Sequence, residues 1–314
     1  MKLSGIRCLT GLFILPELAG PEQNVIKSSM QFLSGGRCGI QEKRVPYTTI
    51  NAWNVYYESH GEGETMILLH HGFGCTKMWK DIWPALVKAG YRVVLYDRRG
   101  YGRSEGGADY LEFYVSEEFR PHSVQGLAEL KAHLGIGPCH LVGQCEGGVV
   151  AADYAAKYPD QVRSLVTSST QCFSEVPMTE LNALKFTKAF SELDPDLKAK
   201  FLDWHGEKNA EPLFNQFRLC GGAYGKDYFD LRNTLGSVMC PALVLYPDRS
   251  FIFDVEQGVA FYRHLLRGEL MVLPNCGHNT YEERPAEYIQ AILDFHARLK
   301  SPSPRHKARI SCAA

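Results

Sequence analysis

The stretch that most constrains this chain is His-Leu-Val-Gly-Gln-Cys-Glu-Gly-Gly-Val-Val at residues 140–150. A short apolar run ends at Gly143, a single reactive side chain follows at Cys145, and two glycines lead into an alanine-rich segment that continues to Lys157. This order predicts a strand, a sharp turn and a helix, with the pattern Gly-x-Cys-x-Gly at the bend. Glycines suit such a turn because neighbouring backbones come too close to leave room for a Cβ.

We expect Cys145 to be a nucleophile rather than a structural cysteine. The predicted helix begins directly after it, so unpaired backbone N–H groups and the positive end of the helix dipole face the sulfur. That environment stabilises a thiolate, and we therefore predict a lowered pKa for Cys145 and the highest reactivity among the ten cysteines. The pentapeptide alone is a weak signal, because nine other cysteines lie in the chain.

The order of the surrounding motifs strengthens this interpretation. An apolar run at residues 66–69 leads into His-His-Gly-Phe-Gly, upstream of the turn. Downstream, Asp248 and His278 each follow a predicted strand, at residues 242–246 and 269–273. The three reactive groups therefore come in the order nucleophile, acid, histidine.

These motifs resemble those of the α/β-hydrolase fold family, over roughly residues 45–300. Asp-Arg-Arg-Gly-Tyr-Gly-Arg-Ser at residues 97–104 resembles the family's D-x-R-G-x-G-x-S loop. The family's usual turn is Gly-x-Ser-x-Gly, so the chain departs from the pattern at its nucleophile. A cysteine there is similar to dienelactone hydrolases and polyhydroxyalkanoate synthases, whereas the other motifs look more like those of serine esterases.

The resemblance implies an α/β fold with a mostly parallel, doubly wound sheet and helices on both faces. We predict an N-terminal arm at residues 1–43, a hydrolase domain at 44–300 and a disordered basic tail at 301–314. Helical patterns without strands at residues 172–238 predict an insertion in the domain, and the resemblance implies that this insertion is a helical lid over the active site. The aromatic residues of this segment, which predict a partly apolar substrate pocket, are Phe201, Trp204, Phe214, Phe217, Tyr224, Tyr228 and Phe229.

The resemblance also implies a catalytic triad of Cys145, Asp248 and His278. His278 would take the thiol proton and later protonate the leaving group, while Asp248 would fix the imidazole tautomer. The backbone N–H groups of Phe73 and Glu146 match the family's oxyanion hole. The Glu146 carboxylate either faces the pocket, where it would favour a cationic substrate group, or bonds within the turn.

We predict a hydrolase that cleaves a carboxylic ester, a lactone or a thioester through a covalent thioester acyl-enzyme. An acyltransferase or a macrolactone-forming thioesterase, in which an alcohol replaces water, is the first alternative. A serine hydrolase whose nucleophile has been changed to cysteine and a ligand-binding protein without turnover are the others.

Charge and cysteine spacing narrow the range of partners. The formal net charge of −1 gives no reason to expect nucleic acid or an anionic membrane as a partner. The ten cysteines form no C-x-x-C pair, so we predict neither a zinc site nor a disulfide framework. Nothing else in the sequence suggests a metal or an organic cofactor, and we predict none. The expected partner is a small-molecule acyl substrate with an apolar portion, and the expected location is the cytoplasm.

The N-terminus leaves one alternative open on location. Lys2 and Arg7 precede an apolar run at residues 8–15, which fits a weak secretory or organellar signal. The run is too short to span a bilayer.

Overall fold

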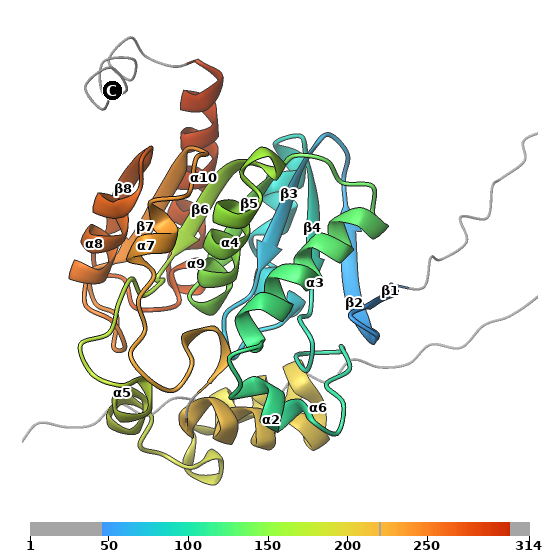
Figure 1. Cartoon of the computed structure of the whole chain (residues 1–314), viewed down its shortest axis with the longest axis vertical. Helices are drawn as coiled ribbons and strands as arrows, with labels where there is room; N and C mark the ends of the chain where they lie inside the picture. Colours follow the sequence, from blue (N-terminus) through green and yellow to red (C-terminus); the bar gives the residue numbers. More distant parts are fainter. Residues whose placement is uncertain (1–45, 220, 302–314) are drawn as a thin grey trace, which may run out of the picture. The chain divides into compact units, whose positions relative to one another are not determined.

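A computed structural model describes residues 46–219 and 221–301, in which an eight-stranded sheet is the central element (Figure 1). The strands are β1 Tyr47–Ile50, β2 Trp53–His60, β3 Glu64–Leu69, β4 Tyr91–Tyr96, β5 Cys139–Gln144, β6 Val162–Ser168, β7 Ala242–Pro247 and β8 Gly268–Leu273. Their order in space is β1-β2-β4-β3-β5-β6-β7-β8. Strand β2 is antiparallel to β1 and β4, and every pairing from β4 to β8 is parallel. The predicted mostly parallel sheet is confirmed.

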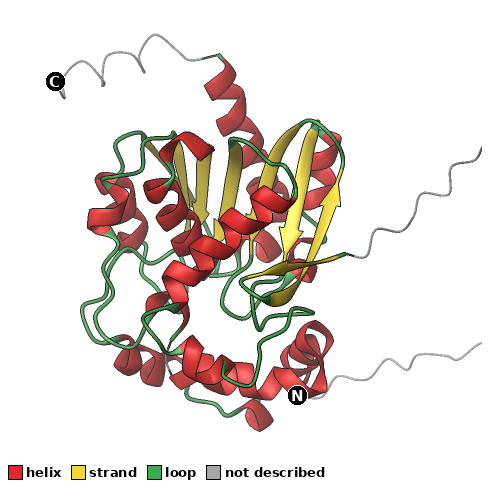
Figure 2. Cartoon of the chain, turned by 45° about the vertical axis from the view of Figure 1, so that its right-hand side comes forward, coloured by secondary structure: helices red, strands yellow, loops and turns green. Residues whose placement is uncertain are grey.

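Helices cover both faces of the sheet (Figure 2). The helices are α1 Trp83–Lys88, α2 Tyr110–Tyr114, α3 Phe119–His133, α4 Glu146–Lys157, α5 Met178–Lys185, α6 Pro195–Leu219, α7 Arg232–Leu235, α8 Glu256–His264, α9 Thr280–Glu283 and α10 Pro285–Lys300. Short 3-10 turns are η1 Thr76–Trp79, η2 Pro159–Gln161, η3 Phe190–Glu192 and η4 Gly222–Tyr224.

Alternate residues of β3 show why its whole sequence is apolar. Ile67 packs into the buried cluster formed with α3, α4 and α8, whereas Met66 and Leu68 pack into the cluster formed with α1 and α10. Successive side chains of a strand point to opposite faces, and here both faces are covered. The strand is therefore buried on each side, as its continuous apolar run predicts.

Strands β1 and β2 form an antiparallel hairpin at the start of the domain. Asn51 and Ala52 connect the two strands with φ values of 48° and 67°. Two positive φ values in a two-residue loop give the turn whose twist matches antiparallel strands. The arm predicted at residues 1–43 and nearly all of the tail predicted at 301–314 lie outside the described residues.

The segment between β3 and β4 forms two short helical pieces rather than one continuous helix. A 3-10 turn ends at Trp79, and α1 begins only at Trp83. Pro84 explains this start, because proline is favoured in the first turn of a helix and disrupts later turns.

Residues 169–241, which we call the helical insertion, connect β6 to β7. They contain α5, η3, α6, η4 and α7. Gly206 interrupts helix α6 with a φ of 73° and a ψ of 162°. The insertion lies at the carboxyl ends of the strands, below the sheet in Figure 1.

A buried serine lies between two histidines at the opposite end of the strands. Ser164 Oγ is 2.8 Å from His140 Nδ1 and 2.9 Å from His296 Nε2. Burial lowers the pKa of both histidines, that of His296 to about 3. Both rings are therefore neutral at pH 7.

This cluster should make the fold sensitive to acid. Since the folded-state pKa values are depressed, the stability that the histidines contribute is complete above their ordinary pKa of about 6.5 and is lost as the pH falls towards 3. His296→Gln removes one such group, so the free energy of unfolding should fall less steeply below pH 6.5 than in the wild type. Urea unfolding at several pH values measures this slope. His133→Gln, at an exposed histidine, is the control, and a wild-type slope in His296→Gln would contradict the assignment.

Candidate active site

Cys145 lies at the predicted sharp turn between β5 and α4. Its φ of 50° and ψ of −117° are strained for a residue with a side chain. A Cβ at Gly143 would lie 2.4 Å from Gly147 O, and a Cβ at Gly147 would lie 2.2 Å from Leu69 O. The glycines are thus required by close backbone contacts, for the reason that the sequence pattern suggested.

Cys145 and His278 line one cavity of about 410 Å³, which we call the aromatic cavity. Its walls come from the loop after β3, from the helical insertion and from the loops after β7 and β8. The aromatic side chains that line it are Phe73, Phe186, Phe201, Trp204, Phe214, Phe217 and Phe251. Four of these were expected from the insertion sequence, whereas Tyr228 is 68% exposed and does not contribute. The six cysteines that the structure describes are all buried, and among them only Cys145 lines this cavity.

The protonation state of Cys145 differs from the sequence prediction. Burial raises the pKa of the Cys145 thiol to about 12, although the backbone N–H of Glu146 at the start of α4 favours the thiolate. Burial also lowers the pKa of His278 to about 4. The predicted lowering of the thiol pKa is therefore wrong, because desolvation outweighs the helix N-terminus. At pH 7 the site holds a neutral thiol and a neutral imidazole.

Tyr224 contacts Cys145, a contact that the sequence did not indicate. Its hydroxyl oxygen lies 3.5 Å from Cys145 Sγ and accepts the N–H of Gln171 at 3.4 Å. The hydroxyl proton is then available to the sulfur. Tyr224 stands in η4, far from the Gly-x-Cys-x-Gly turn in sequence, and was expected only as an aromatic residue of the insertion.

Asp248 does not contact His278, which corrects the predicted triad. Its Oδ1 accepts the N–H of Cys276 at 3.0 Å, and its own N–H donates to Leu273 O at 3.2 Å. The exposed carboxylate is thereby held on the turn that precedes His278. Instead, Ser250 Oγ lies 3.0 Å from His278 Nδ1.

Phe73, one of the two predicted oxyanion donors, uses its N–H within its own loop. The N–H donates to His71 Nδ1 at 3.1 Å. His71 must then carry its proton on Nε2, which lies 3.0 Å from the hydroxyl oxygen of Tyr281. The other predicted donor, the N–H of Glu146, faces the sulfur of Cys145.

The Glu146 carboxylate is fully buried and lies outside the aromatic cavity. Its Oε1 is 2.6 Å from Arg98 Nη2 and accepts the hydroxyl of Tyr101 at 3.0 Å. Its Oε2 accepts the N–H of Ala223 at 3.2 Å. Of the two interpretations of this residue, bonding inside the protein is the one that the structure supports.

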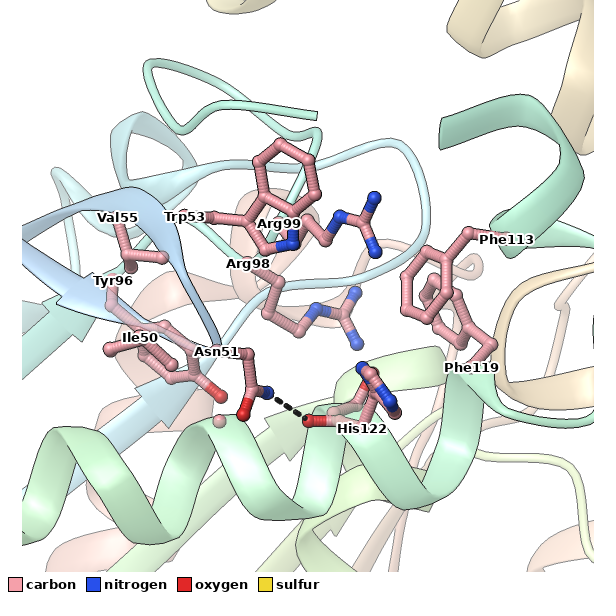
Figure 3. Close-up of a pocket in the computed structure, with 12 residues that line it drawn as sticks. Ile50, Asn51, Trp53, Val55, Tyr96, Arg98, Arg99, Phe113, Phe119 and His122 are labelled. Carbon is pink, nitrogen blue, oxygen red and sulfur yellow. Dashed lines mark hydrogen bonds between the residues drawn. The ribbon is translucent and has the colours of Figure 1, made fainter. Parts of the chain in front are cut away.

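Arg98 also lines a second cavity, of about 30 Å³ (Figure 3). Its Nε and Nη1 atoms, and the hydroxyl of Tyr96, are buried and have no hydrogen-bond partner among the described residues. A space of this size suits ordered water rather than an organic substrate. It contains neither Cys145 nor His278, so the aromatic cavity is the candidate active site.

Other kinds of site find little support in the described residues. Within residues 46–219 and 221–301, no three His, Cys, Asp or Glu side chains gather in a way that would hold a metal ion. No helix in these ranges has the length and apolar character needed to cross a membrane.

Comparison with known proteins gives a consistent result. Residues 64–219 match a family model described as the alpha/beta hydrolase fold. A 2-hydroxy-6-oxononadienedioate/2-hydroxy-6-oxononatrienedioate hydrolase of Comamonas testosteroni is 26% identical over 287 residues, which cover 80% of this chain and 96% of the relative. A proline iminopeptidase of Lactobacillus crispatus is 26% identical over 298 residues, covering 82% and 99%. The crystal structure of the enol-lactonase from Burkholderia xenovorans LB400 superimposes with a TM-score of 0.65 at 20% identity, covering 80% of this chain and all of that one.

Removal of the charge on Glu146 should destabilise the protein strongly. Glu146→Gln leaves the Arg98 guanidinium buried without its counter-charge, and loss of one partner of a buried pair costs about 3–5 kcal/mol. The free energy of unfolding in urea measures this loss. Glu287→Gln is the matched control, since its ion pair with Arg284 is exposed and should contribute far less. Equal losses in the two variants would show that the buried pair has no special structural role.

Proposed function

Because this chain belongs to the α/β-hydrolase fold family and is a hydrolase, we propose that it cleaves a carboxylic ester, a lactone or a thioester with Cys145 as nucleophile. The observation that carries the proposal is that Cys145, at a strained turn, shares one mostly aromatic cavity with His278. The relatives carry the names of hydrolases with unlike substrates, so they support hydrolysis more than any particular bond.

The first step starts from a neutral pair. The thiol pKa is raised and the imidazole pKa is lowered, so the proton must leave the sulfur as it attacks. His278 takes that proton while the bond from sulfur to the carbonyl carbon forms and the carbonyl electron pair moves to oxygen. The Glu146 N–H, at the start of α4, is the donor placed to receive the developing negative charge.

The next steps release both halves of the substrate. The bond from the carbonyl carbon to the leaving group breaks, and His278 returns its proton to that group. A thioester on Cys145 remains. Water, whose proton passes to His278, attacks this thioester, and the acid leaves as the sulfur regains its proton. Each cycle consumes one water molecule, and an alcohol in place of water would give acyl transfer.

We assign the orientation of the imidazole to Ser250 and a positioning role to Asp248. With Nδ1–H donated to Ser250 Oγ, Nε2 of His278 is free to act as the base. A neutral hydroxyl stabilises an imidazolium less than a carboxylate does, which agrees with the low pKa of His278. Asp248 acts indirectly, by holding the Cys276 N–H of the turn that carries His278.

Acyl trapping tests the nucleophile. We expect intact-protein mass spectrometry with p-nitrophenyl esters, lactones and acyl-thioesters to show one acyl group, and peptide mapping to place it on Cys145. Cys145→Ala should show no adduct, and His278→Ala should slow both acylation and release of the acyl group in single-turnover kinetics. Acylation of another residue, or near wild-type turnover by folded His278→Ala, would overturn the mechanism. Cys145→Ser tests the remaining alternative, since a large gain in ester hydrolysis would identify a serine-adapted site.

Two variants compare the partners of His278. Ser250→Ala should lower kcat about five- to tenfold, because one hydrogen bond that orients the imidazole is lost. Asp248→Asn should keep most of the activity, since its amide oxygen can still accept the Cys276 N–H. Steady-state kinetics with one chromogenic ester measures both. A larger loss in Asp248→Asn than in Ser250→Ala would restore the carboxylate as the imidazole partner.

A further inference from the structure

The aromatic cavity has an uneven distribution of charge. Among the described residues that line it there is no aspartate and no glutamate, whereas three lysines and two histidines contribute. Burial lowers the pKa of His71 and of His278, so both rings are neutral at pH 7. The charge around the cavity therefore comes from Lys185, Lys188 and Lys200.

Lys200 is already neutralised by protein groups. Its Nζ is 2.6 Å from Glu282 Oε1 and lies 4.7 Å from the centre of the Trp204 ring. The ammonium groups of Lys185 and Lys188, by contrast, have no ion-pair or hydrogen-bond partner within residues 46–219 and 221–301. Lys185 stands in the last turn of α5 and faces the negative end of that helix dipole. Lys188 lies beyond the helix and lacks even this compensation.

Aromatic packing holds this pair of lysines at the cavity. Phe186, between them in sequence, makes edge-on contacts with Phe73 at 5.6 Å and with Phe217 at 5.5 Å between ring centroids. Both of those rings line the cavity. The segment is thus fixed on the cavity wall by its apolar side chain, while its two exposed lysines remain at the edge. An aromatic interior with a cationic edge fits a molecule that has an apolar body and an anionic end.

We propose that the substrate of this hydrolase carries an anionic group, a carboxylate or a phosphate, which Lys185 and Lys188 bind while its apolar portion occupies the aromatic cavity. This inference rests on the proposed function and specifies its substrate class. It also reverses the charge preference that a pocket-facing Glu146 would have given, since that carboxylate is paired with Arg98 outside the cavity.

Matched substrates test the charge preference. For a carboxylate, mono-p-nitrophenyl adipate is compared with p-nitrophenyl hexanoate, which has the same six-carbon acyl chain without the charge. For phosphate, hexanoyl-coenzyme A is compared with hexanoyl-N-acetylcysteamine. We expect a higher kcat/KM for the anionic member of at least one pair, and a loss of that preference as salt rises. The pair that shows the preference identifies the anion.

The double variant Lys185→Gln/Lys188→Gln tests the residues. It should lower kcat/KM for the preferred anionic substrate about three- to tenfold and leave its neutral partner unchanged. Lys198→Gln is the control, because this lysine lies over the Phe190 ring and does not line the cavity. An unchanged ratio of anionic to neutral substrate in the double variant overturns the inference while hydrolysis itself persists.

Binding to Cys145→Ala separates this inference from the proposed reaction. Calorimetry with hexanoate and hexanamide compares a charged with a neutral end on the same six-carbon chain, without turnover. If no ester or thioester is hydrolysed, the proposed reaction fails, and the calorimetric comparison still decides charge selectivity. Equal affinity for hexanoate and hexanamide, together with equal kcat/KM within each pair, would leave the lysines without a role in substrate binding.

Discussion

The buried ion pair between Arg98 and Glu146 is the interaction on which the candidate active site depends. It joins the loop after β4 to the first residue of α4, directly after Cys145. The second carboxylate oxygen accepts the N–H of Ala223, and the next residue, Tyr224, places its hydroxyl at Cys145 Sγ. Burial of two charges costs so much solvation that such a pair adds little net stability. Its value here is geometric, because it fixes three distant segments around one sulfur atom.

Burial also determines the chemistry that this sulfur can perform. A neutral thiol reacts slowly with oxidants and alkylating agents, since the thiolate is the nucleophile. A histidine with a pKa of about 4 is in turn a weak base. In the proposed reaction the thiolate and imidazolium would therefore form only as the bond to the substrate forms, which would favour acyl groups that are already activated. Thioesters, lactones and esters with good leaving groups meet this requirement better than amides do.

Much of the fold was predictable because its signals are local. Strands β3 and β7 contain the apolar runs at residues 66–69 and 242–246 that the sequence showed, since strands buried on both faces are continuous apolar runs. The turn at Cys145 was predictable because close backbone contacts demand glycine at fixed positions. The partner of His278 was not, because Asp248 and Ser250 both follow β7, and the choice depends on hydrogen bonds from Asp248 to the loop after β8. The raised pKa of the Cys145 thiol was equally unpredictable, since it follows from burial of the sulfur by the folded chain, which the residues around the turn do not reveal.

The sheet and the helical insertion contribute different kinds of side chain to the candidate active site. Cys145 and His278 follow the carboxyl ends of β5 and β8, where the fold holds them at a fixed separation. The aromatic and cationic groups that would choose the substrate, such as Phe186 and Lys188, belong instead to the insertion. The formal net charge of −1 does not reveal the lysines at the cavity, because a sum over the whole chain does not show where the charges lie in the folded protein. The side chains that would select the substrate therefore belong mostly to the insertion, whereas the side chains proposed to carry out the reaction follow strands of the sheet.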